Sequence, residues 1–461
     1  MTHHDLGTPV PEDSAPADIL DPADATAQGA DARPHWVRNA ILFLGGQTAS
    51  LFGSMLVQYA IMWHLTLETK SGLVLGLAAV FGFLPQALIS IFAGVWADRM
   101  NRKVLIIAAD ASIALTTLAL ALYMLSGHDD LWLIYLTLAI RSVGAGIQMP
   151  AVAAIIPQIV PMNQLMRING INGSIQSAMA LLAPAAAMLV YVNFSIIAIF
   201  FIDVVTAAIG IGLLLLIPVP TIRKASDVAL NYFEDLVEGV RYVWTHSFVR
   251  WLLMLFGVVF LLAAGPSYLT PLMLVRSFGE EAWMLAVLEI SFSVGMMLAG
   301  ILIAIWAGTK NRVAMIVITA MSFAVLTLGM GLTTNLWVFF GLMFLFGLAV
   351  PYFSTPSMTL LQEKVEPERH GRVFSIMGIV MAIAMPLGMV VLGPLADIYT
   401  VESLLFVCGG LMIIAVTIAI AVPAGRRAMA AANAPTVPET AADPAPESAA
   451  EPAAQDSPHV G

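Results

Sequence analysis

The sequence predicts an all-α membrane protein with twelve transmembrane helices in two six-helix halves. Of its 461 residues, 59% are hydrophobic and only 11% are charged, which is more apolar surface than a soluble core needs. A bilayer requires such surface, because each spanning helix takes about 20 apolar residues. Twelve apolar stretches of this length follow one another, and the basic residues gather in every second connection between them.

Composition also limits the chemistry that the chain can perform. The single cysteine, Cys408, excludes a disulfide framework and a cysteine-based metal site. The net charge of -10 comes from the two ends: residues 1–34 carry seven acids and one Arg, and residues 425–461 carry five acids and two Arg. The nearly neutral body gives no indication of an acidic substrate. Residues 1–34 show no signal-peptide pattern, so we expect the first span to direct insertion.

The first half of the chain begins after a polar tail. Residues 1–34 are rich in Pro, Asp and Ala, which predicts a disordered cytoplasmic segment. The N-terminal six-helix half follows over residues 35–217, and short polar turns separate its spans. The six predicted spans cover residues 36–66, 73–96, 104–126, 131–156, 168–192 and 196–217.

The longest internal polar segment, residues 218–250, is predicted to be a cytoplasmic linker between the halves. Its apolar residues recur at helical spacing, and acidic side chains lie off that stripe, which indicates an amphipathic helix on the membrane surface. A helix docked on the bundle would give the same linker role. The apolar stripe consists of Leu230, Phe233, Val237, Val240 and Trp244.

The C-terminal six-helix half is predicted over residues 251–424. Gly265-Pro266 interrupts its first span, and Pro351 and Pro356 break its fourth. The Ala-, Pro- and Glu-rich residues 425–461 predict a second disordered cytoplasmic tail. The spans of this half cover residues 251–274, 282–306, 313–333, 336–361, 373–396 and 402–422.

The basic residues predict the orientation. With both termini inside, 17 of the 20 Lys and Arg residues fall in cytoplasmic segments. Lys70 and Arg276 fall outside, and Arg141 lies within a span. This asymmetry predicts twelve spans in the plasma membrane with both termini cytoplasmic, because one miscounted span would invert every later loop.

The connection between the second and third spans reads Gly94-Val95-Trp96-Ala97-Asp98-Arg99-Met100-Asn101-Arg102-Lys103. Its spacing resembles the corresponding loop of the major facilitator superfamily of transporters, where this loop latches the cytoplasmic gate. The resemblance implies a latch of Gly94, Asp98, Arg99, Arg102 and Lys103, in which the aspartate accepts hydrogen bonds at a helix N-terminus. An ordinary positive-inside loop is the alternative, although it requires neither Gly94 nor Asp98.

Four ionisable residues lie inside predicted spans, where a charge costs about 2.5–3.5 kcal/mol at the centre of an inserted helix. Arg141 lies near mid-membrane, and the superfamily resemblance ties an arginine of this span to proton coupling; a structural ion pair is the alternative. Asp203 and Glu289 suit proton carriers or counter-charges for a cationic drug, because burial disfavours the charged carboxylate. Asp203 can equally lock two helices together. Asp110, near the inner end of its span, suits a gate or packing role.

A polar stripe runs along the first span, formed by Gln47, Ser50, Ser54 and Gln58 at spacings of three and four residues. Together with Gln148, which lies seven positions after Arg141, it predicts the lining of a substrate cavity. Packing between helices through small residues is the alternative explanation.

Three prolines are predicted to bend helices during gating: Pro184, Pro266 and Pro386. Ala183-Pro184 stands where the antiporter branch of the superfamily has a Gly-Pro motif. Four further segments look like the macrolide-efflux branch of the drug:proton antiporters. These are residues 47–54, 150–157, 233–244 and 370–375. The resemblance implies a secondary active transporter that exports bulky amphipathic compounds by proton antiport with alternating access.

Several functions are excluded or left open. The sequence holds no phosphate-binding loop, no soluble catalytic domain and no metal-ligand spacing, so we expect no ATP-driven pump, no enzyme, no cofactor and no metal. The expected partners are a small amphipathic substrate, protons and the bilayer, with no nucleic acid, and the protein is expected to be monomeric. Export of a native metabolite, siderophore or bile-type compound, lysophospholipid transport, and a membrane sensor remain alternatives.

Overall fold

The structure is a computed structural model that describes residues 35–219, 232–306, 311–366 and 369–433. In this part of the chain the regular structure is helical, and twelve helical segments are long and apolar enough to cross a membrane. The predicted tail 1–34 and most of the predicted tail 425–461 lie outside the described residues.

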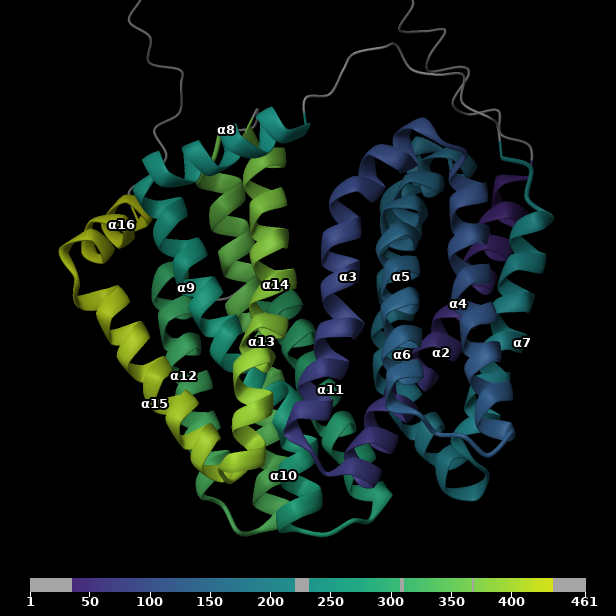
Figure 1. The fold of residues 1–461 in the computed structure, drawn as a ribbon. Coiled ribbons are helices and arrows are strands. Elements are labelled where there is room, and N and C mark those ends of the chain that lie inside the picture. The colour runs from purple at the N-terminus through teal and green to yellow at the C-terminus, as the bar shows by residue number, and fades with distance from the viewer. Residues whose placement is uncertain (1–34, 220–231, 307–310, 367–368, 434–461) are drawn as a thin grey trace, which may run out of the picture.

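The N-terminal half packs six long helices on one side of the molecule (Figure 1). The strongest pairings within it join α2 to α7, α3 to α5, and α4 to α5. Its elements are α2 (Trp36–Thr69), α3 (Gly72–Arg99), α4 (Arg102–Leu125), α5 (Leu131–Ile159), the short η1 (Met162–Gln164), α6 (Leu165–Asn193) and α7 (Ile196–Leu215).

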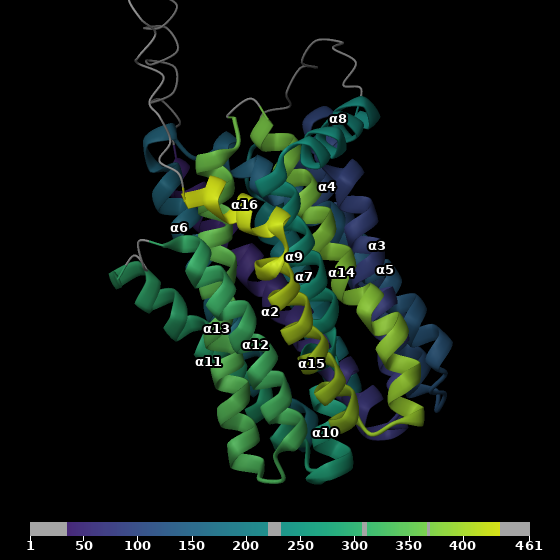
Figure 2. The same cartoon turned by 90° about the vertical axis from the view of Figure 1, so that its left-hand side faces the viewer.

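The C-terminal half lies beside the first and repeats its six-span plan (Figure 1). Its first span is composite, because a π-helical turn separates two α-helices. The elements are α9 (Ser247–Ala264), η2 (Gly265–Leu269), α10 (Thr270–Ser277), α11 (Ala282–Trp306), α12 (Arg312–Leu332), α13 (Leu336–Lys364), α14 (His370–Ile398) and α15 (Val401–Ala421). A short helix, α16 (Pro423–Asn433), folds back against α9 and α15 (Figure 2).

Helix α8 (Tyr232–Thr245) lies across one end of the bundle, against the start of α14 (Figure 1). We call this the linker end, and the opposite end, which carries α10, the far end. Glu238 of α8 forms an ion pair with Arg372 of α14 at 2.5 Å. Three residues of the predicted apolar stripe, Val237, Val240 and Trp244, are exposed, as a face turned toward a bilayer surface would be. The side chains of Leu230 and Phe233 are outside the described set.

The helix ends agree with the predicted spans to within four residues, which confirms the predicted fold class. Polar side chains fix several of these ends. Ser71 caps α3 through the Val74 N–H, and Asn101 Oδ1 accepts from the Lys103 N–H at 3.0 Å to cap α4. Short polar turns therefore act as helix stops between membrane-length apolar runs.

One predicted interruption is wrong. Pro351 and Pro356 lie inside α13, which continues as an α-helix from Leu336 to Lys364. In a bilayer, no water is available to satisfy the backbone groups that a broken helix exposes. Continuing the helix through a proline is therefore cheaper than ending it.

Close backbone approach between helices depends on glycine at a few positions. Where α11 crosses α13, a Cβ on Gly295 would lie 2.1 Å from the Phe344 carbonyl oxygen, and one on Gly347 would lie 2.1 Å from that of Phe292. Any larger residue would push the two helices apart. The two halves themselves meet through α3 against α14 and α6 against α11.

Candidate functional site

A buried ion pair lies inside the N-terminal half. Arg141 of α5 donates to Asp203 Oδ2 of α7 at 2.6 Å, and the two side chains are 8% and 0% exposed. The same guanidinium donates to Thr117 Oγ1 of α4 and, at 3.2 Å, to the Ser54 carbonyl of α2. Arg141 thus joins four helices, and Asp203 compensates its charge as burial requires.

Glycine brings α2 close enough to take part in this pair. A Cβ on Gly53 would lie 2.0 Å from Thr206 Oγ1 and 2.9 Å from the Asp203 Cα. With glycine there, Ser54 Oγ donates to Asp203 Oδ1 at 3.4 Å. The position of the carboxylate is therefore set from two sides, by the arginine and by the first span.

A second buried carboxylate, Asp110 of α4, lies nearer the linker end and is 2% exposed. Its Oδ1 accepts from Ser50 Oγ at 3.1 Å and from Gln148 Nε2 at 2.5 Å. Its Oδ2 has no hydrogen-bond partner among the described residues. Asp110 precedes Thr117 by seven residues, or about 10 Å along the helix. The two aspartates therefore belong to separate polar layers.

A cavity of about 300 Å³ lies between the halves, walled by α2, α3 and α5 on one side and by η2 and α11 on the other. Its apolar wall includes Met55, Met62 and Phe83. Phe83 of α3 meets Tyr268 of η2 edge to face across the halves, with ring centroids 5.7 Å apart. The polar groups of the lining are Gln58, Tyr59, Ser267, Tyr268 and Glu289.

Glu289 is the one ionisable carboxylate of that lining. It is half-buried, and within the described part of the chain no hydrogen bond or ion pair to it is found. Glu289 thus differs from Asp203, whose charge is already matched by Arg141. A carboxylate that faces a cavity without a fixed partner is free to bind a proton or a cationic ligand.

The predicted polar stripe divides between the cavity and the buried layers. Gln58 lines the cavity, whereas Ser54 and Ser50 turn toward the two aspartates and Gln148 binds Asp110. Gln47 is half-buried in the part of α2 nearer the linker end. Because an α-helix turns 100° per residue, Gln58 points about 80° away from Ser50. A stripe spaced by four residues therefore drifts from one helix face to another.

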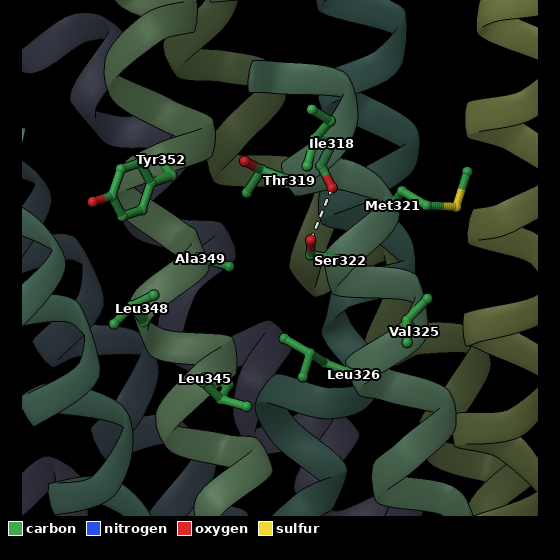
Figure 3. Close-up of a pocket in the computed structure, with 10 residues that line it drawn as sticks. All are labelled: Ile318, Thr319, Met321, Ser322, Val325, Leu326, Leu345, Leu348, Ala349 and Tyr352. Atoms are coloured by element: carbon green, nitrogen blue, oxygen red, sulfur yellow. Dashed lines mark hydrogen bonds between the residues drawn. The ribbon is translucent and has the colours of Figure 1, made fainter. Parts of the chain in front are cut away.

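A larger cavity of about 560 Å³ lies elsewhere, between α12 and α13 (Figure 3). Its lining holds no charged residue, and the hydroxyl groups of Thr319 and Ser322 donate to carbonyls one turn earlier, the latter at 2.9 Å to Ile318 (Figure 3). Ile318 and Val325 are largely exposed, so the cavity opens to the outside of the bundle. The hydroxyl groups of Thr319 and Ser322 are thus already bonded within α12, and most of the lining is apolar.

The far end of the molecule carries a lock that sequence reasoning missed. Asp397, at the end of α14, accepts hydrogen bonds from the N–H groups of Gly72 at 2.6 Å and Leu73 at 2.9 Å, and from Ser71 Oγ at 2.8 Å. A carboxylate of the C-terminal half thus caps the N-terminus of α3 in the other half. The helix dipole favours an anion at this place.

Three further contacts strengthen this lock. Arg276 of α10 donates to Asp397 Oδ1 at 3.1 Å and to the Lys70 carbonyl, and Lys70 forms an ion pair with Glu280. Lys70 belongs to the N-terminal half, whereas Arg276, Glu280 and Asp397 belong to the C-terminal half. Both contacts of Lys70 therefore cross between the halves. The far end is therefore closed.

A sequence signal for the lock exists. Gly393-Pro394-Leu395-Ala396-Asp397 repeats the Gly-x-x-Ala-Asp pattern of Gly94-Val95-Trp96-Ala97-Asp98. Each pattern lies at the end of a helix that carries Gly-x-Val at its start, because Gly72 is the first residue of α3 and Gly371 is the second of α14. Both Gly72 to Asp98 and Gly371 to Asp397 span 26 positions. The two helices thus carry the same pattern, and they pack together in opposite directions.

The predicted latch at the linker end is described only in part. The side chains of Gly94, Asp98 and Arg99 lie outside the described residues, and Arg102 makes contacts there. Lys103 Nζ donates to the carbonyls of Leu215 at 2.9 Å and Ile217 at 2.8 Å. This lysine therefore binds the C-terminal end of α7, where the helix dipole favours a cation.

The three prolines predicted to bend helices lie in different settings. Pro184 and Pro386 are buried inside α6 and α14, which remain α-helical around them. Pro266 lies in the π-helical turn η2, whose next residues, Ser267 and Tyr268, line the cavity. A π-helical turn is a local irregularity often found at functional sites.

Replacing Gly72 with alanine should open the far end. The new Cβ would lie 2.4 Å from the Gly393 carbonyl oxygen and 2.5 Å from the Ala396 Cβ, but only while the end is closed. Cys408 is buried, so cysteines introduced at the exposed Trp132 and Trp337 can be spin-labelled selectively. We expect the distance between these labels to lengthen in the variant.

The matched control for this change is Gly82→Ala in the same helix, where an added Cβ meets nothing within 4 Å. That variant should leave the label distance unchanged and gain the usual helix preference of alanine over glycine, about 1 kcal/mol. An unchanged distance in Gly72→Ala would mean that the contact of α3 with α14 does not hold the far end closed.

The sequence matches the family model described as Major Facilitator Superfamily over residues 43–321 and 282–449. Macrolide efflux protein A of Streptococcus pyogenes is 31% identical over 383 residues, which cover 82% of this chain and 94% of that relative. Macrolide efflux protein A of Enterococcus faecalis is 31% identical over 323 residues, which cover 69% of this chain and 99% of that relative.

Solved transporter structures share the arrangement of helices. The nucleoside transporter NupG aligns with a TM-score of 0.63 at 14% identity, over 85% of this chain and 98% of its own. A bacterial homolog of the human lysosomal transporter Spinster aligns with a TM-score of 0.62 at 14% identity, over 87% and 98%. At such identities the likeness concerns the fold alone.

Proposed function

The chain belongs to the Major Facilitator Superfamily, and from this premise we propose that it exports bulky amphipathic compounds of the macrolide type across the plasma membrane in exchange for protons. The observation that carries the proposal is the cavity between the halves, which combines an apolar wall with one unpaired carboxylate, Glu289. The two macrolide efflux proteins at 31% identity support the substrate class.

The linker end faces the cytoplasm in this proposal. Three basic residues, Arg99, Arg102 and Lys103, follow one another closely at that end, and 17 of the 20 Lys and Arg residues fall on the same side by the sequence count. Lys70 and Arg276 lie at the far end. The positive-inside rule then places α8 and both chain termini in the cytoplasm.

The two Gly-x-x-Ala-Asp patterns support alternating access. At the far end, Gly72 and Gly393 are in close contact and Asp397 caps α3. At the linker end, a Cβ on Gly371 would meet nothing within 4 Å among the described residues, so Gly371 makes no close contact there like that of Gly72 with Gly393. This difference supports an inward-open state. In the outward-open state, we propose that Asp98 caps α14 as Asp397 caps α3 here, consistent with the inverted repeats of this superfamily.

In the outward-open state, the cytoplasmic side is thus closed by the latch residues Gly94, Asp98, Arg99, Arg102 and Lys103. Asp98→Asn should favour the inward-open state and keep the far-end labels close, opposite to the effect of Gly72→Ala. Pro184, Pro266 and Pro386 lie inside helices of the moving halves, and in this proposal these helices bend there, because proline removes a backbone hydrogen bond.

The cavity chemistry suits a bulky amphipathic amine. Met55 and Met62 are unbranched and polarisable, so they adapt to different apolar shapes. Gln58 and Tyr268 supply hydrogen-bonding groups, and Glu289 supplies the counter-charge for a cationic amine. A proton and a cationic substrate then compete for the same carboxylate, which is a simple basis for exchange. One chain encloses the whole cavity, so a monomer suffices.

Arg141 and Asp203 have a supporting role in this scheme. Their pair sets the position of α2, whose next turn carries Gln58 and Tyr59 of the cavity. Arg141 lies one helical turn beyond Leu138, which also lines the cavity. A change in this pair is therefore transmitted to the cavity wall through two helices.

Flux in everted vesicles tests the substrate class. Vesicles that carry the full chain should take up a macrolide against its gradient, and Gln58→Ala should weaken this uptake without loss of protein from the membrane. Bile salts and lysophospholipids are measured in parallel. Uptake of lysophospholipid without uptake of any macrolide would contradict the proposed substrate class and assign the chain to lipid transport.

A further inference from the structure

We propose that Asp110 is a proton-binding site, which holds a proton on Oδ2 in the conformation described here and releases it during transport. The bound proton follows from the surroundings of this side chain. Its release during transport rests on the proposed proton antiport, so the two parts are tested separately.

Asp110 is buried in a way that an ionised carboxylate cannot sustain. The residue is 2% exposed, and both of its hydrogen-bond donors, Ser50 Oγ and Gln148 Nε2, bind Oδ1. Oδ2 has no hydrogen-bond partner among the described residues. An unpaired charge in such a place is far costlier than a neutral polar group, so the group is neutralised instead.

Among the described residues, no cation lies close enough to neutralise it. On α5, Arg141 is committed to Asp203, Thr117 and the Ser54 carbonyl. On α7, Asp203 is itself acidic, and on α2 the contact is the neutral Ser50. On α4 itself, the nearest basic residues are Arg102 and Lys103, about 10 Å away at the helix end.

A metal ion fits the place less well than a proton. Metal ions such as Mg²⁺ and Ca²⁺ require several oxygen ligands around them. The free oxygen of Asp110 has no polar neighbour in bonding geometry, and the described residues contain no group of three or more His, Cys, Asp or Glu that could hold a metal. A proton needs one oxygen only, and Oδ2 provides it.

Three acids that the sequence places inside spans thus have three different surroundings. Asp203 is paired with Arg141, Glu289 faces the cavity, and Asp110 has neither a cation nor open solvent beside it. Of its two hydrogen-bond donors, Gln148 is half-buried and Ser50 is almost fully buried. We therefore expect Asp110 to exchange its proton with water on the side of Gln148.

Infrared difference spectroscopy of the purified full chain tests the bound proton directly. The carbonyl stretch of protonated carboxyl groups should be present near neutral pH in the wild type, and Asp110→Asn should remove the part of this band that belongs to Asp110. Glu68→Gln, at an exposed position, is the control and should leave the band unchanged. If Asp110→Asn removes only carboxylate bands, the residue is ionised and the proposal is wrong.

Thermal unfolding provides an independent check, because asparagine matches a protonated aspartate in shape and charge. Asp110→Asn should keep a melting temperature close to that of the wild type. Asp203→Asn, which strands the charge of Arg141, should lower it strongly. Equal losses of melting temperature in both variants would overturn the proposal. It would also be overturned if sodium chloride, but not potassium chloride, raised the melting temperature of the wild type and had no such effect on Asp110→Asn, because Asp110 would then bind sodium rather than a proton.

Proton counting in proteoliposomes tests the release. Asp110→Asn should move fewer protons per exported macrolide than the wild type, and an unchanged ratio would remove Asp110 from the transport cycle. If wild-type export shows no dependence on the pH gradient, the proposed proton antiport fails. The infrared band and the melting temperatures still decide whether Asp110 holds a proton, so the two failures are distinguishable.

Discussion

Replacing Glu289 with glutamine should abolish export driven by a pH gradient while leaving downhill exchange of substrate in place. The residue lines the cavity between the halves and has no fixed partner in the described part of the chain, so it can alternate between a proton and a cationic substrate. Glutamine keeps the size of the side chain but cannot ionise. The measurement is macrolide accumulation in everted vesicles with an imposed pH gradient, followed by exchange of labelled for unlabelled macrolide without a gradient.

Glu68→Gln is the matched control, because Glu68 is an exposed acid on α2, the same helix as Gln58. It should export at the wild-type rate. Undiminished uphill export in Glu289→Gln would mean that another carboxylate carries the proton. Loss of both export and exchange, with the protein still folded, would mean that Glu289 is needed for binding rather than for coupling.

Removing the Arg141 side chain should be the most destabilising single change in the N-terminal half. Arg141→Ala strands Asp203, which is fully buried, and breaks bonds to three neighbouring helices. Breaking a buried ion pair by deleting one partner costs about 3–5 kcal/mol. Unfolding in detergent, followed by tryptophan fluorescence, should show this loss together with loss of transport.

A double variant separates charge from packing. Arg141→Met combined with Asp203→Leu removes both charges and keeps apolar volume, so much of the stability should return. Arg427→Ala, which alters an exposed arginine near the end of the described chain, should change little. If the double variant is no more stable than Arg141→Ala, the loss is caused by the missing bonds to Thr117 and Ser54 rather than by an unpaired charge.

The fold is readable from the sequence because the bilayer imposes one rule on every span. A membrane helix must be long, apolar and closed by polar turns, and these features are local in the chain. Predicted and observed ends such as 282–306 and Ala282–Trp306 therefore coincide. Where a local rule competes with the bilayer, as at Pro351 in α13, the soluble-protein expectation of a break is wrong.

The site is only partly readable, because it depends on how helices rotate against each other. Sequence indicates that Arg141 and Asp203 must be shielded, but not that they meet each other. It groups Gln58 with Ser50 and Ser54, although a rotation of about 80° separates the cavity from the buried layer. Asp110 is assigned to gating or packing by its depth alone, whereas its unpartnered oxygen is visible only in three dimensions.

The far-end lock was missed for a different reason. Its aspartate, Asp397, lies in a Gly-x-x-Ala-Asp pattern without the basic residues that mark the loop after Asp98. The arginines that identify the loop after Asp98 are therefore no guide to the second pattern, which ends at Asp397. A search by the spacing of 26 residues between the first glycine and the aspartate of each helix finds it. The anion in both patterns is suited to the same task, which is to cap the helix that packs against it.

Proton-driven export is the central claim, and its most direct test is macrolide flux in proteoliposomes with a pH gradient of either sign. The wild type should accumulate macrolide only when proton flow runs opposite to substrate movement, and a protonophore should abolish accumulation. Macrolide that enters one compartment should be accompanied by protons that leave it, so the pH of that compartment should rise and the pH of the other should fall. Accumulation that ignores both the sign of the gradient and the protonophore would contradict the account.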